Sequence, residues 1–498
     1  MVTDHNWESL KTLAQAYPLI PVFKILPAHT RSPLDTFRIL KTLSRQCFIL
    51  ESLEDTEHWG RYTFLGYDPK LEITCTNGTV RIKNGTCLQF QTHDPGSYIK
   101  HILEENRSPC LPELPPFSGG LVGYFSYDYI KYQEPTLNLD AADAEGFKDL
   151  DLMLFDKLIA YDHTLGRLIL INHIKTNALK ENYNRALGEL EHLAALIQTA
   201  TVVEPMPLRI CSSFRWLFDK EQYCTMVQRA KAYIREGDIF QVVLSNRLEA
   251  EAEGSLFHTY QVLRRLNPSP YMFYFSSDDL EIAGASPETM VKLVGDEVFT
   301  FPLAGTRPRG KTQEEDAALE QDLLRDAKEL AEHTMLVDLG RNDLGKIAAF
   351  GSVRVKKYRS VEKFSHVMHL GSTVQGRLVA GKSALDAIDA VLPAGTLSGA
   401  PKIRSCQIIN ELENNKRGIY GGAIGYLGFA GAMDTCIAIR LVFKKNGKVF
   451  IRSGAGIVAD SVPSLEFEEC KNKLKAVLLA MEEAGSPGVG HERKEVLA

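Results

Sequence analysis

The sequence lacks the features that place a protein in a membrane, on nucleic acid or in an oxidising compartment. No apolar run approaches the ~20 residues that a helix needs to span a bilayer, and the N-terminal stretch has no apolar centre typical of a signal peptide. No basic run is present and the net charge is −6, which argues against nucleic acid as a main partner. The 9 cysteines show neither a C-x-x-C pair nor metal-ligand spacing, so we expect reduced thiols and a cytoplasmic protein.

Internal repeats and low-complexity segments are also missing, and the composition is that of a globular protein. Hydrophobic residues make up 44% of the chain and charged residues 24%. A chain of 498 residues exceeds one ordinary core, and Pro205 and Pro207 mark the best candidate boundary. The sequence therefore predicts an N-terminal part (residues 1–204), a larger part (residues 205–485) and a flexible tail (residues 486–498).

Two-residue turn signals recur between short alternating runs. They are Asn77-Gly78, Asn84-Gly85, Gly295-Asp296 and Asn446-Gly447. Asn-Gly in a two-residue loop favours the I′ turn, which matches strand twist, so we expect the flanking strands to be antiparallel. Stretches with a helical period, such as 223–234, lie between them. Many antiparallel strands with long helices between them indicate an α+β fold.

The stretch with the clearest chemistry joins a glycine-rich strand end to an acidic helix start. Gly454 and Gly456 allow a ligand to approach the backbone, and Glu466 and Glu469 lie three residues apart on one helix face. Amide donors beside carboxylates suit an anion bound next to Mg²⁺. Taken alone, the stretch could equally be a strand–turn–helix junction whose glutamates pair with Lys473 on a solvated face.

Three further candidates lie on or beside predicted strands. Gln241, on a predicted strand over Ile239–Leu248, would be buried and needs hydrogen-bond partners from the protein or from a ligand. Glu288 begins a strand, where a carboxyl group can donate a proton or simply form a turn. Arg440 lies inside an apolar run that predicts a strand over Cys436–Lys445, and it needs a carboxylate or another anion as partner.

The remaining candidates lie on a helix and another strand. A single helix predicted from about Gln313 to Asp338 carries Glu329 and Glu332, which could also belong to a solvated helix face. His369 lies on a strand, where a single histidine is more often structural. Together the candidates indicate a pocket with Mg²⁺, carboxylate-binding amides, an arginine and one or two proton donors. The residues alone indicate a Mg²⁺-dependent lyase or transferase of a small carboxylate.

Two nucleotide-binding patterns compete with this interpretation. Residues 305–312 match the phosphate loop G-x-x-x-x-G-K-[ST] and would indicate hydrolysis of ATP or GTP. Pro308 removes a backbone N–H donor from that loop, and the preceding strand belongs to an antiparallel hairpin. Residues 454–459 match the dinucleotide fingerprint, but no second strand follows to complete a βαβ unit. We therefore reject both patterns.

Longer motifs stand in order along the chain. They are Asp238-Ile-Phe-Gln-Val-Val-Leu-Ser, Ala285-Ser-Pro-Glu288, Pro302-Leu-Ala-Gly-Thr-Arg-Pro-Arg-Gly310, Ala331-Glu-His-Thr-Met-Leu-Val-Asp338, Pro393-Ala-Gly-Thr-Leu-Ser-Gly-Ala-Pro-Lys402, Tyr420-Gly-Gly-Ala-Ile-Gly-Tyr426 and Gly454-Ala-Gly-Ile-Val-Ala-Asp460. In this combination the chain resembles the chorismate-utilising enzymes, strongly over residues 215–485 and more weakly before them. The resemblance implies an αββα sandwich of two large, mostly antiparallel sheets, with helices outside and the active site between the sheets.

The resemblance also assigns roles to residues. It makes 205–485 the chorismate-binding catalytic part. Glu332 and Glu469 would bind Mg²⁺, with Glu329 and Glu466 as supporting acids, and the ion would bridge to the ring carboxylate of chorismate. The chorismate-binding set would be Gly305, Thr306, Tyr420, Arg440, Gly454, Ala455 and Gly456.

A few positions indicate the branch of the family. Isochorismate and salicylate synthases have a water-activating lysine at the position of Gln241, and aminodeoxychorismate synthase has a ring-attacking lysine at the position of Ala304. The resemblance is therefore closest to the anthranilate-forming branch, with aminodeoxychorismate synthase component I or isochorismate synthase as the alternative. It implies that ammonia adds at C2 while Glu288 protonates the leaving C4 hydroxyl group. His369 would serve pyruvate elimination from aminodeoxyisochorismate, in the first step of tryptophan biosynthesis.

A partner and a regulator are implied as well. The chain has no G-x-C-x-G nucleophile motif, so its ammonia would come from a separate glutamine amidotransferase subunit, in a heterotetramer. A non-catalytic tryptophan-sensing module is the rival of a different class, but a sensor has no need of Glu288, Glu332 and Glu469. Feedback inhibition by tryptophan is implied by residues that match the family's tryptophan-binding segments, namely Ser52, Pro270, Tyr271 and Met272.

Overall fold

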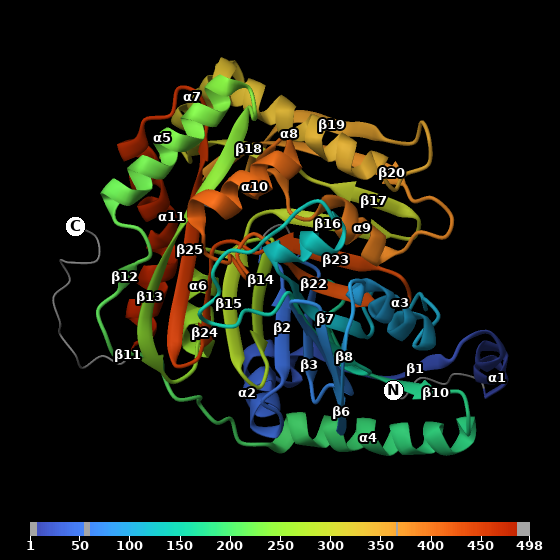
Figure 1. Ribbon diagram of the computed structural model, residues 1–498. Coiled ribbons are helices and arrows are strands. Elements are labelled where there is room, and N and C mark those ends of the chain that lie inside the picture. The colour runs from blue at the N-terminus through green and yellow to red at the C-terminus, as the bar shows by residue number, and fades with distance from the viewer. Residues whose placement is uncertain (1–6, 54–59, 365–366, 486–498) are drawn as a thin grey trace.

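The computed structural model describes residues 7–53, 60–364 and 367–485. Their strands form two large sheets, of 13 and 12 strands (Figure 1). The predicted tail, residues 486–498, lies outside the described residues. No helix in this part of the chain combines the length and the apolar character needed to cross a lipid bilayer.

The first sheet runs, from one edge to the other, through β1 (Leu19–Pro27), β10 (Arg167–Lys175), β9 (Lys157–Asp162), β3 (Tyr62–Tyr67), β2 (Cys47–Glu51), β14 (Tyr271–Ser276), β15 (Leu280–Ser286), β24 (Leu441–Lys445), β25 (Lys448–Ile457), β13 (Gln241–Glu253) and β11 (Arg209–Ile210). Two short strands also pair with β13, β12 (Arg215–Trp216) and β21 (Gly399–Ala400).

The second sheet runs through β18 (Leu303–Pro308), β20 (Val367–Arg377), β17 (Glu297–Thr300), β16 (Thr289–Val294), β23 (Met433–Ile437), β22 (Ala423–Gly428), β7 (Gly120–Phe125), β8 (Leu150–Phe155), β4 (Leu71–Thr76), β5 (Thr79–Asn84) and β6 (Thr86–Gln91), with β19 (Arg354–Lys363) beside β20. The helices are α1 (Trp7–Ala16), α2 (Pro33–Leu43), α3 (Pro95–Glu105), α4 (Leu179–Thr199), α5 (Lys220–Glu236), α6 (Phe257–Leu266), α7 (Gln313–Arg325), α8 (Ala327–Gly345), α9 (Ala384–Val391), α10 (Lys402–Glu413) and α11 (Pro463–Ala484). Short 3-10 helices cover Ala28–Thr30, Tyr127–Tyr132 and Gly395–Leu397.

The two sheets pack face to face, and the helices cover their outer faces. A cluster rich in aromatic side chains fills the space between the sheets, where the rings of Phe48 (β2) and Phe155 (β8) lie 4.8 Å apart. A second cluster joins the first sheet to α1, α2, α4, α6 and α11, and a third joins the second sheet to α3, α8 and α9. Figure 1 shows α5, α10 and α11 beside β13 and β25. The predicted αββα sandwich is confirmed.

The predicted antiparallel pairing is confirmed at all four turns, but the two-residue loop predicted at Asn84-Gly85 is wrong, because Asn84 pairs directly with Thr86. The strand pairs β4–β5, β5–β6, β16–β17 and β24–β25 are all antiparallel hairpins. Asn77 and Gly78 have φ angles of +48° and +79°, and Asn446 and Gly447 have φ angles of +53° and +71°. Positive φ at both central residues defines the I′ turn that the Asn-Gly signal predicts.

The single helix predicted over 313–338 is wrong, because the chain forms two helices with a break at Asp326. Asp326 has extended backbone angles, and its side chain accepts hydrogen bonds from the backbone N–H groups of Lys328 and Glu329. This side chain therefore caps the start of α8. Apolar residues continue at a helical period through both helices, so their spacing alone does not reveal the break.

The chain passes between the sheets at two adjacent places, which we call the crossings. Residues 287–288 lead from β15 in the first sheet to β16 in the second, and residues 438–440 lead from β23 in the second sheet to β24 in the first. The backbone N–H of Ile437 donates to the carbonyl oxygen of Glu288 at 2.9 Å. The two crossings therefore lie side by side.

The strand predicted over Cys436–Lys445 is wrong in its continuity. The chain leaves the second sheet after β23, and Arg440 lies in the second crossing with a φ angle of +53°. The backbone N–H of Ala285 donates to the carbonyl oxygen of Arg440 at 3.1 Å. Because both flanking strands are buried, the apolar run is continuous and does not show where the chain changes sheets.

Both sheets contain strands from each side of the predicted division at residues 204 and 205. In the first sheet β2 pairs with β14, and in the second sheet β7 pairs with β22. Residues 200–206, which connect α4 to the later strands, have no regular secondary structure. The division at residues 204 and 205 therefore stays a prediction about the order of segments along the chain, since strands from both segments pair within each sheet.

Candidate active site

Glu288 lies in the first crossing, and only 8% of it is exposed. Its Oε1 accepts a hydrogen bond from Thr396 Oγ1 at 3.1 Å. Burial raises the pKa of this carboxyl group to about 8, and the Thr396 hydrogen bond and the charge of Lys473 act in the opposite direction. A carboxyl group that keeps its proton at neutral pH can donate it to a leaving group.

Arg440 lies in the second crossing and is partly buried. Its Nη1 is 3.5 Å from the carbonyl oxygen of Lys473, and it forms no ion pair with any carboxylate among the described residues. Burial lowers the pKa of Arg440, whereas Tyr420 and Glu469 raise it. A guanidinium group in this position can bind an anionic ligand through paired hydrogen bonds.

The glycines of β25 make room for two polar side chains. A Cβ atom on Gly454 would lie 3.1 Å from Tyr420 Oη, and a Cβ atom on Gly456 would lie 2.8 Å from Gln241 Nε2. Ala455 between them is fully buried. Gln241 is 4% exposed, and its Oε1 has no hydrogen-bond partner within the described part of the chain. An unsatisfied acceptor in a buried amide is available to a ligand.

Gly305, Thr306 and His369 meet at the edge of the second sheet. His369 Nδ1 is 2.7 Å from the carbonyl oxygen of Gly305 and 3.1 Å from Thr306 Oγ1. Burial lowers the pKa of His369, with the Gly305 hydrogen bond acting in the opposite direction. If Nδ1 donates to the carbonyl oxygen, Nε2 is left as an acceptor, so the neutral ring can take up a proton.

The same loop shows why the phosphate-loop pattern is misleading. The backbone N–H of Gly310 donates to Asp316 Oδ1 at 2.9 Å, and that of Lys311 donates to Glu315 Oε2 at 2.8 Å. These donors are therefore satisfied by carboxylates of α7 and do not face a bound phosphate. The preceding strand, β18, pairs antiparallel with β20.

The four predicted metal-site acids form what we call the acid face, Glu329 and Glu332 on α8 and Glu466 and Glu469 on α11. Burial raises the pKa of Glu332, and the negative charges of Glu329 and Glu469 raise it further. Burial and the charge of Glu469 also raise the pKa of Glu466. Carboxylates from two helices thus share one negative potential.

The predicted metal can be tested against the chemistry of these side chains. Over residues 7–53, 60–364 and 367–485, no three or more His, Cys, Asp or Glu side chains are gathered as a ready-made metal site. Enzymes commonly bind Mg²⁺ through one or two carboxylates, with water and substrate oxygens completing the coordination. Glu329, Glu332 and Glu466 are partly buried and Glu469 is exposed to water, and like-charged carboxylates on two helices fit such an ion.

Lys473 joins several of the predicted residues. Its Nζ forms an ion pair with Glu469 Oε1 at 2.6 Å and donates to the carbonyl oxygen of Gly454 at 2.9 Å. The ion pair is the one expected for a solvated helix face. The positive charge of Lys473 also acts to lower the pKa values of Glu288 and Glu332. Lys473 therefore links Gly454 of β25 and Glu288 of the first crossing with the acids of α8 and α11.

Two features of the site were not predicted. Thr396 lies inside the motif Pro393–Lys402, but nothing in the motif distinguishes it from its neighbours. Glu413 at the end of α10, Arg417 and Arg452 of β25 form a buried charged cluster. Arg452 follows the apolar residues of β25, which is the signal that identified Arg440 and could have identified Arg452.

The predicted regulatory residues come from neighbouring strands of the first sheet. Ser52 follows β2, and Pro270–Met272 lie at the start of β14. Met272 pairs with Glu51, and the backbone N–H of Leu53 donates to the carbonyl oxygen of Ser269 at 3.2 Å. The fold thus brings the two segments together from distant parts of the chain.

Tyr271 connects this region to the first crossing. Its Oη donates to Asp434 Oδ1 at 2.7 Å and lies 2.8 Å from Thr289 Oγ1. Thr289 directly follows Glu288. A change at Tyr271 could therefore reach the first crossing through a single side-chain contact.

Known proteins are similar to this chain over most of its length. Residues 45–479 match the profile of a family described as chorismate binding enzyme. Anthranilate synthase component 1 of Acetivibrio thermocellus is 44% identical over 488 residues, which cover 96% of this chain and 98% of that protein. Anthranilate synthase component 1 of Acinetobacter calcoaceticus is 43% identical, with 97% of this chain and 98% of that protein covered.

Solved structures show the same fold. The crystal structure of anthranilate synthase component I from Streptococcus pneumoniae TIGR4 superposes with a TM-score of 0.73 at 39% identity, covering 86% of this chain and 93% of that one. The menaquinone-specific isochorismate synthase of Escherichia coli superposes with a TM-score of 0.69 at 18% identity, covering 95% of this chain and 98% of that one. At that identity the second likeness shows the fold alone.

Proposed function

The chain belongs to the chorismate binding enzyme family, and from this premise we propose that it is the chorismate-converting component of an anthranilate synthase. The observation that carries the proposal is identity of 40–44% with anthranilate synthase component 1 proteins along almost the whole chain. The reaction converts chorismate and ammonia to anthranilate and pyruvate.

Arg440 and the stretch Gly454–Gly456 of β25, which we call the glycine strand, are proposed to bind the substrate. Chorismate carries two carboxylates, and Arg440 has no carboxylate partner among the described residues. Gly454 and Gly456 allow close approach to the backbone beside Tyr420 and Gln241. Gly305 and Thr306 complete the proposed set from the opposite sheet.

Gln241 and Ala304 support direct addition of ammonia. Ammonia is already a nucleophile. Gln241 Oε1, which has no hydrogen-bond partner among the described residues, can accept a hydrogen bond from one N–H of ammonia and so turn the nitrogen lone pair toward C2. Ala304 has no group that could attack the ring. As the C2–N bond forms and the ring double bonds shift, the C4–O bond breaks, and Glu288 gives its proton to the departing oxygen, which leaves as water.

His369 is proposed to act in the second half of the reaction. Aminodeoxyisochorismate loses its C2 proton while the C3–O bond breaks, which leaves an aromatic ring and releases the enolate of pyruvate. The enolate takes up a proton at its methylene carbon and becomes pyruvate. A neutral His369 with a free Nε2 can accept that proton. Glu332 and Glu469 would bind Mg²⁺, with Glu329 and Glu466 supporting them, and the bound ion would stabilise negative charge on the ring carboxylate.

The ammonia is proposed to come from a glutamine amidotransferase subunit, anthranilate synthase component II, in a heterotetramer. We also propose feedback inhibition by tryptophan bound near Ser52, Pro270, Tyr271 and Met272. The Tyr271–Thr289 contact gives the inhibitor a short route to Glu288.

The test uses the purified chain alone with chorismate, Mg²⁺ and concentrated ammonium at mildly alkaline pH. Anthranilate is followed by its fluorescence, with product masses, an EDTA control and an arm with micromolar tryptophan. We expect metal-dependent anthranilate that tryptophan suppresses. An amino- or hydroxy-chorismate isomer would show that Gln241 and Ala304 were assigned to the wrong branch. If tryptophan has no effect, the regulatory proposal fails while the catalytic one stands.

A further inference from the structure

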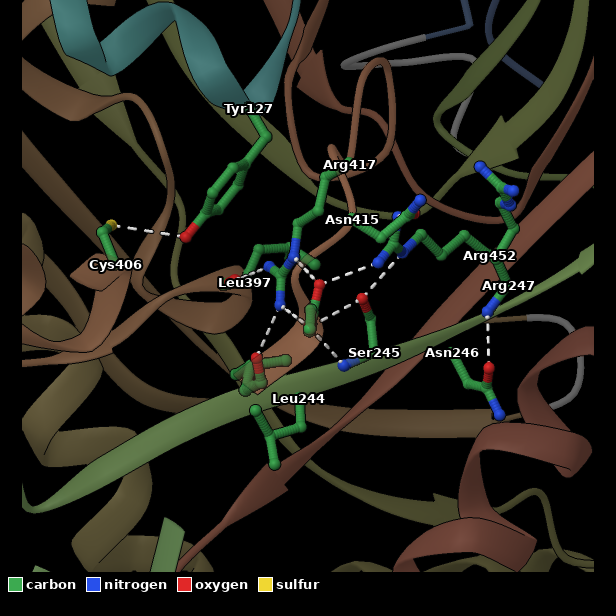
Figure 2. Close-up of polar contacts among 12 residues, drawn as sticks. Tyr127, Leu244, Ser245, Asn246, Arg247, Leu397, Cys406, Asn415, Arg417 and Arg452 are labelled. Carbon is green, nitrogen blue, oxygen red and sulfur yellow. Dashed lines mark hydrogen bonds and ion pairs between the residues drawn. The ribbon is translucent and has the colours of Figure 1, made fainter. Parts of the chain in front are cut away.

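Glu413, Arg417 and Arg452, which we call the arginine cluster, form a buried network of ion pairs. Figure 2 shows its two arginines among their polar contacts. Their side chains are 0–1% exposed. Arg417 Nη2 lies 2.5 Å from Glu413 Oε1, and Arg452 Nη2 lies 2.8 Å from Glu413 Oε2. The proposed mechanism uses none of these three residues.

The guanidinium group of Arg417 holds two backbone segments together. Its Nη1 donates to the carbonyl oxygen of Leu397 at 2.6 Å, and its Nη2 donates to the carbonyl oxygen of Val243 on β13 at 2.7 Å. Nε donates to Glu413 Oε2 at 2.9 Å. Figure 2 shows the guanidinium group between Leu397 and the strand of Leu244 and Ser245. The planar fork of arginine can serve these acceptors at once, whereas lysine has a single nitrogen.

The segment held by Arg417, residues 394–400, contacts the side chain of Glu288 and pairs with the backbone of Gln241. Thr396 Oγ1 donates to Glu288 Oε1 at 3.1 Å. Ala400 pairs with Gln241 in the ladder between β21 and β13, and the backbone N–H of Val243 donates to the carbonyl oxygen of Ser398 at 2.9 Å. The position of this segment therefore fixes Thr396 against Glu288 in one direction and supports Gln241 in the other.

Arg452 contacts a different part of the site. Its Nε donates to Ser245 Oγ at 2.8 Å, and Ser245 is paired with Gly454 across the ladder between β13 and β25. Its Nη1 donates to Asn415 Oδ1 at 3.0 Å. Arg452 therefore supports the glycine strand and makes no direct hydrogen bond to residues 394–400 in the described structure.

Stability alone does not account for this cluster. Two guanidinium groups and one carboxylate leave one excess positive charge in the interior, and replacing buried ion pairs by packed apolar residues is often neutral or stabilising. A fully hydrogen-bonded network does fix geometry, which an apolar cluster does less strictly.

We infer that the arginine cluster is a positioning unit in which Arg417 fixes residues 394–400 so that Thr396 meets Glu288, while Arg452 fixes the glycine strand. The inference rests on the proposed function, because it takes Glu288 to be the proton donor. The charged groups that face Glu288 are Lys473 of α11 and, across a small cavity, Asp343 of α8, which pairs with Lys402. All three stay unchanged in the test.

The test compares Arg417→Lys, Arg452→Lys and Thr396→Val in ammonia-dependent turnover, followed against pH. Thr396→Val removes a hydrogen bond that stabilises the Glu288 carboxylate, so the pKa of Glu288 rises. The pH above which kcat falls, which we call the alkaline limb, therefore moves to higher pH by about one unit. Arg417→Lys moves the limb in the same direction, and the double variant moves it no further than Thr396→Val alone. Arg452→Lys leaves the limb in place and raises KM for chorismate.

Each outcome decides between the two ideas. If Thr396→Val moves the limb but Arg417→Lys does not, or if their shifts add, the positioning role is overturned and the proposed function survives. If neither variant moves the limb, Glu288 is not the proton donor, and both ideas fail at that point. Should Arg417→Lys not fold, hydrogen exchange of the native chain decides, because we expect residues 394–400 to exchange as slowly as β13. Exchange at the rate of an open loop would overturn the inference.

Discussion

The acid face and the arginine cluster both adjoin β25, but their charges are organised in opposite ways. In the arginine cluster, Arg417 and Arg452 lower the pKa of Glu413 despite its burial. On the acid face, burial and like charges raise the pKa of Glu332. The first cluster is satisfied by the protein itself. The second is compensated only in part, by the Glu469–Lys473 and Glu329–Arg307 ion pairs, and its remaining like charges would favour a bound cation.

Glu332→Gln should have the largest effect. It tests whether the acid face serves turnover, whereas the arginine cluster serves the stability of the fold. The amide cannot replace a carboxylate ligand, and loss of a metal contribution of about 4 kcal/mol lowers turnover about 10³-fold. Unfolding by urea should change by no more than about 0.5 kcal/mol, because the substitution also removes like-charge repulsion. Turnover and urea unfolding are measured on the same preparation.

Glu468→Gln is the matched control on α11, since Glu468 pairs with Lys220 and Lys471 at distances of 3.5 Å and 3.8 Å and lies outside the acid face. It should keep full turnover. A Glu332→Gln variant with full, metal-dependent turnover would remove Glu332 from the metal site and end the contrast between the clusters.

Glu413→Leu should show the reverse pattern, a loss of stability first. The substitution leaves Arg417 and Arg452 buried with no carboxylate between them. Breaking a buried ion pair in this way costs about 3–5 kcal/mol, which urea unfolding measures directly. Arg452→Met is the control, because it leaves the Glu413–Arg417 pair neutral and should cost less. If the two variants lose the same stability, the charge balance of the cluster is not what stabilises it.

Sequence reasoning found the acid face and missed the arginine cluster for physical reasons. Glu466 and Glu469 lie close in sequence on one helix face, so their spacing alone predicts that they act together. Arg417 lies four residues after Glu413, beyond the end of α10, but Arg452 lies on β25, and only the tertiary fold brings it to Glu413. The hairpin turns were predictable because their signal is local and depends on residues that tolerate positive φ.

The two errors in secondary structure have the same origin. Apolar periodicity records burial. It continues through Asp326 because leucines of both helices pack into one cluster, and it continues through the second crossing because both flanking strands are buried. The break at Asp326 depends on a side-chain cap, and the crossing near Arg440 depends on which sheet receives the next strand. Neither is encoded in the spacing of apolar residues.

The smallest expected effect is a shift in Tm that depends on both pH and Mg²⁺. The pKa values of Glu329, Glu332 and Glu466 are raised above the ordinary 4.5, chiefly by burial, and that of Glu288 is raised to about 8. Their contribution to stability is therefore complete below pH 4.5 and is lost as the pH rises through the folded-state values. Without metal, Tm should fall over this range.

Mg²⁺ should reverse the fall in Tm that comes from the acid face and should not change the fall that comes from Glu288. The ion binds deprotonated carboxylates, so at saturation it raises Tm by about 2–3 °C near pH 8 and by less near pH 5, where protons compete. Glu332→Gln should abolish the increase, and Arg452→Met should keep it, because the arginine cluster offers no site to a cation. An increase of equal size at both pH values, or one that survives Glu332→Gln, would mean that Mg²⁺ stabilises the protein elsewhere and that the acid face is only a solvated pair of helix surfaces.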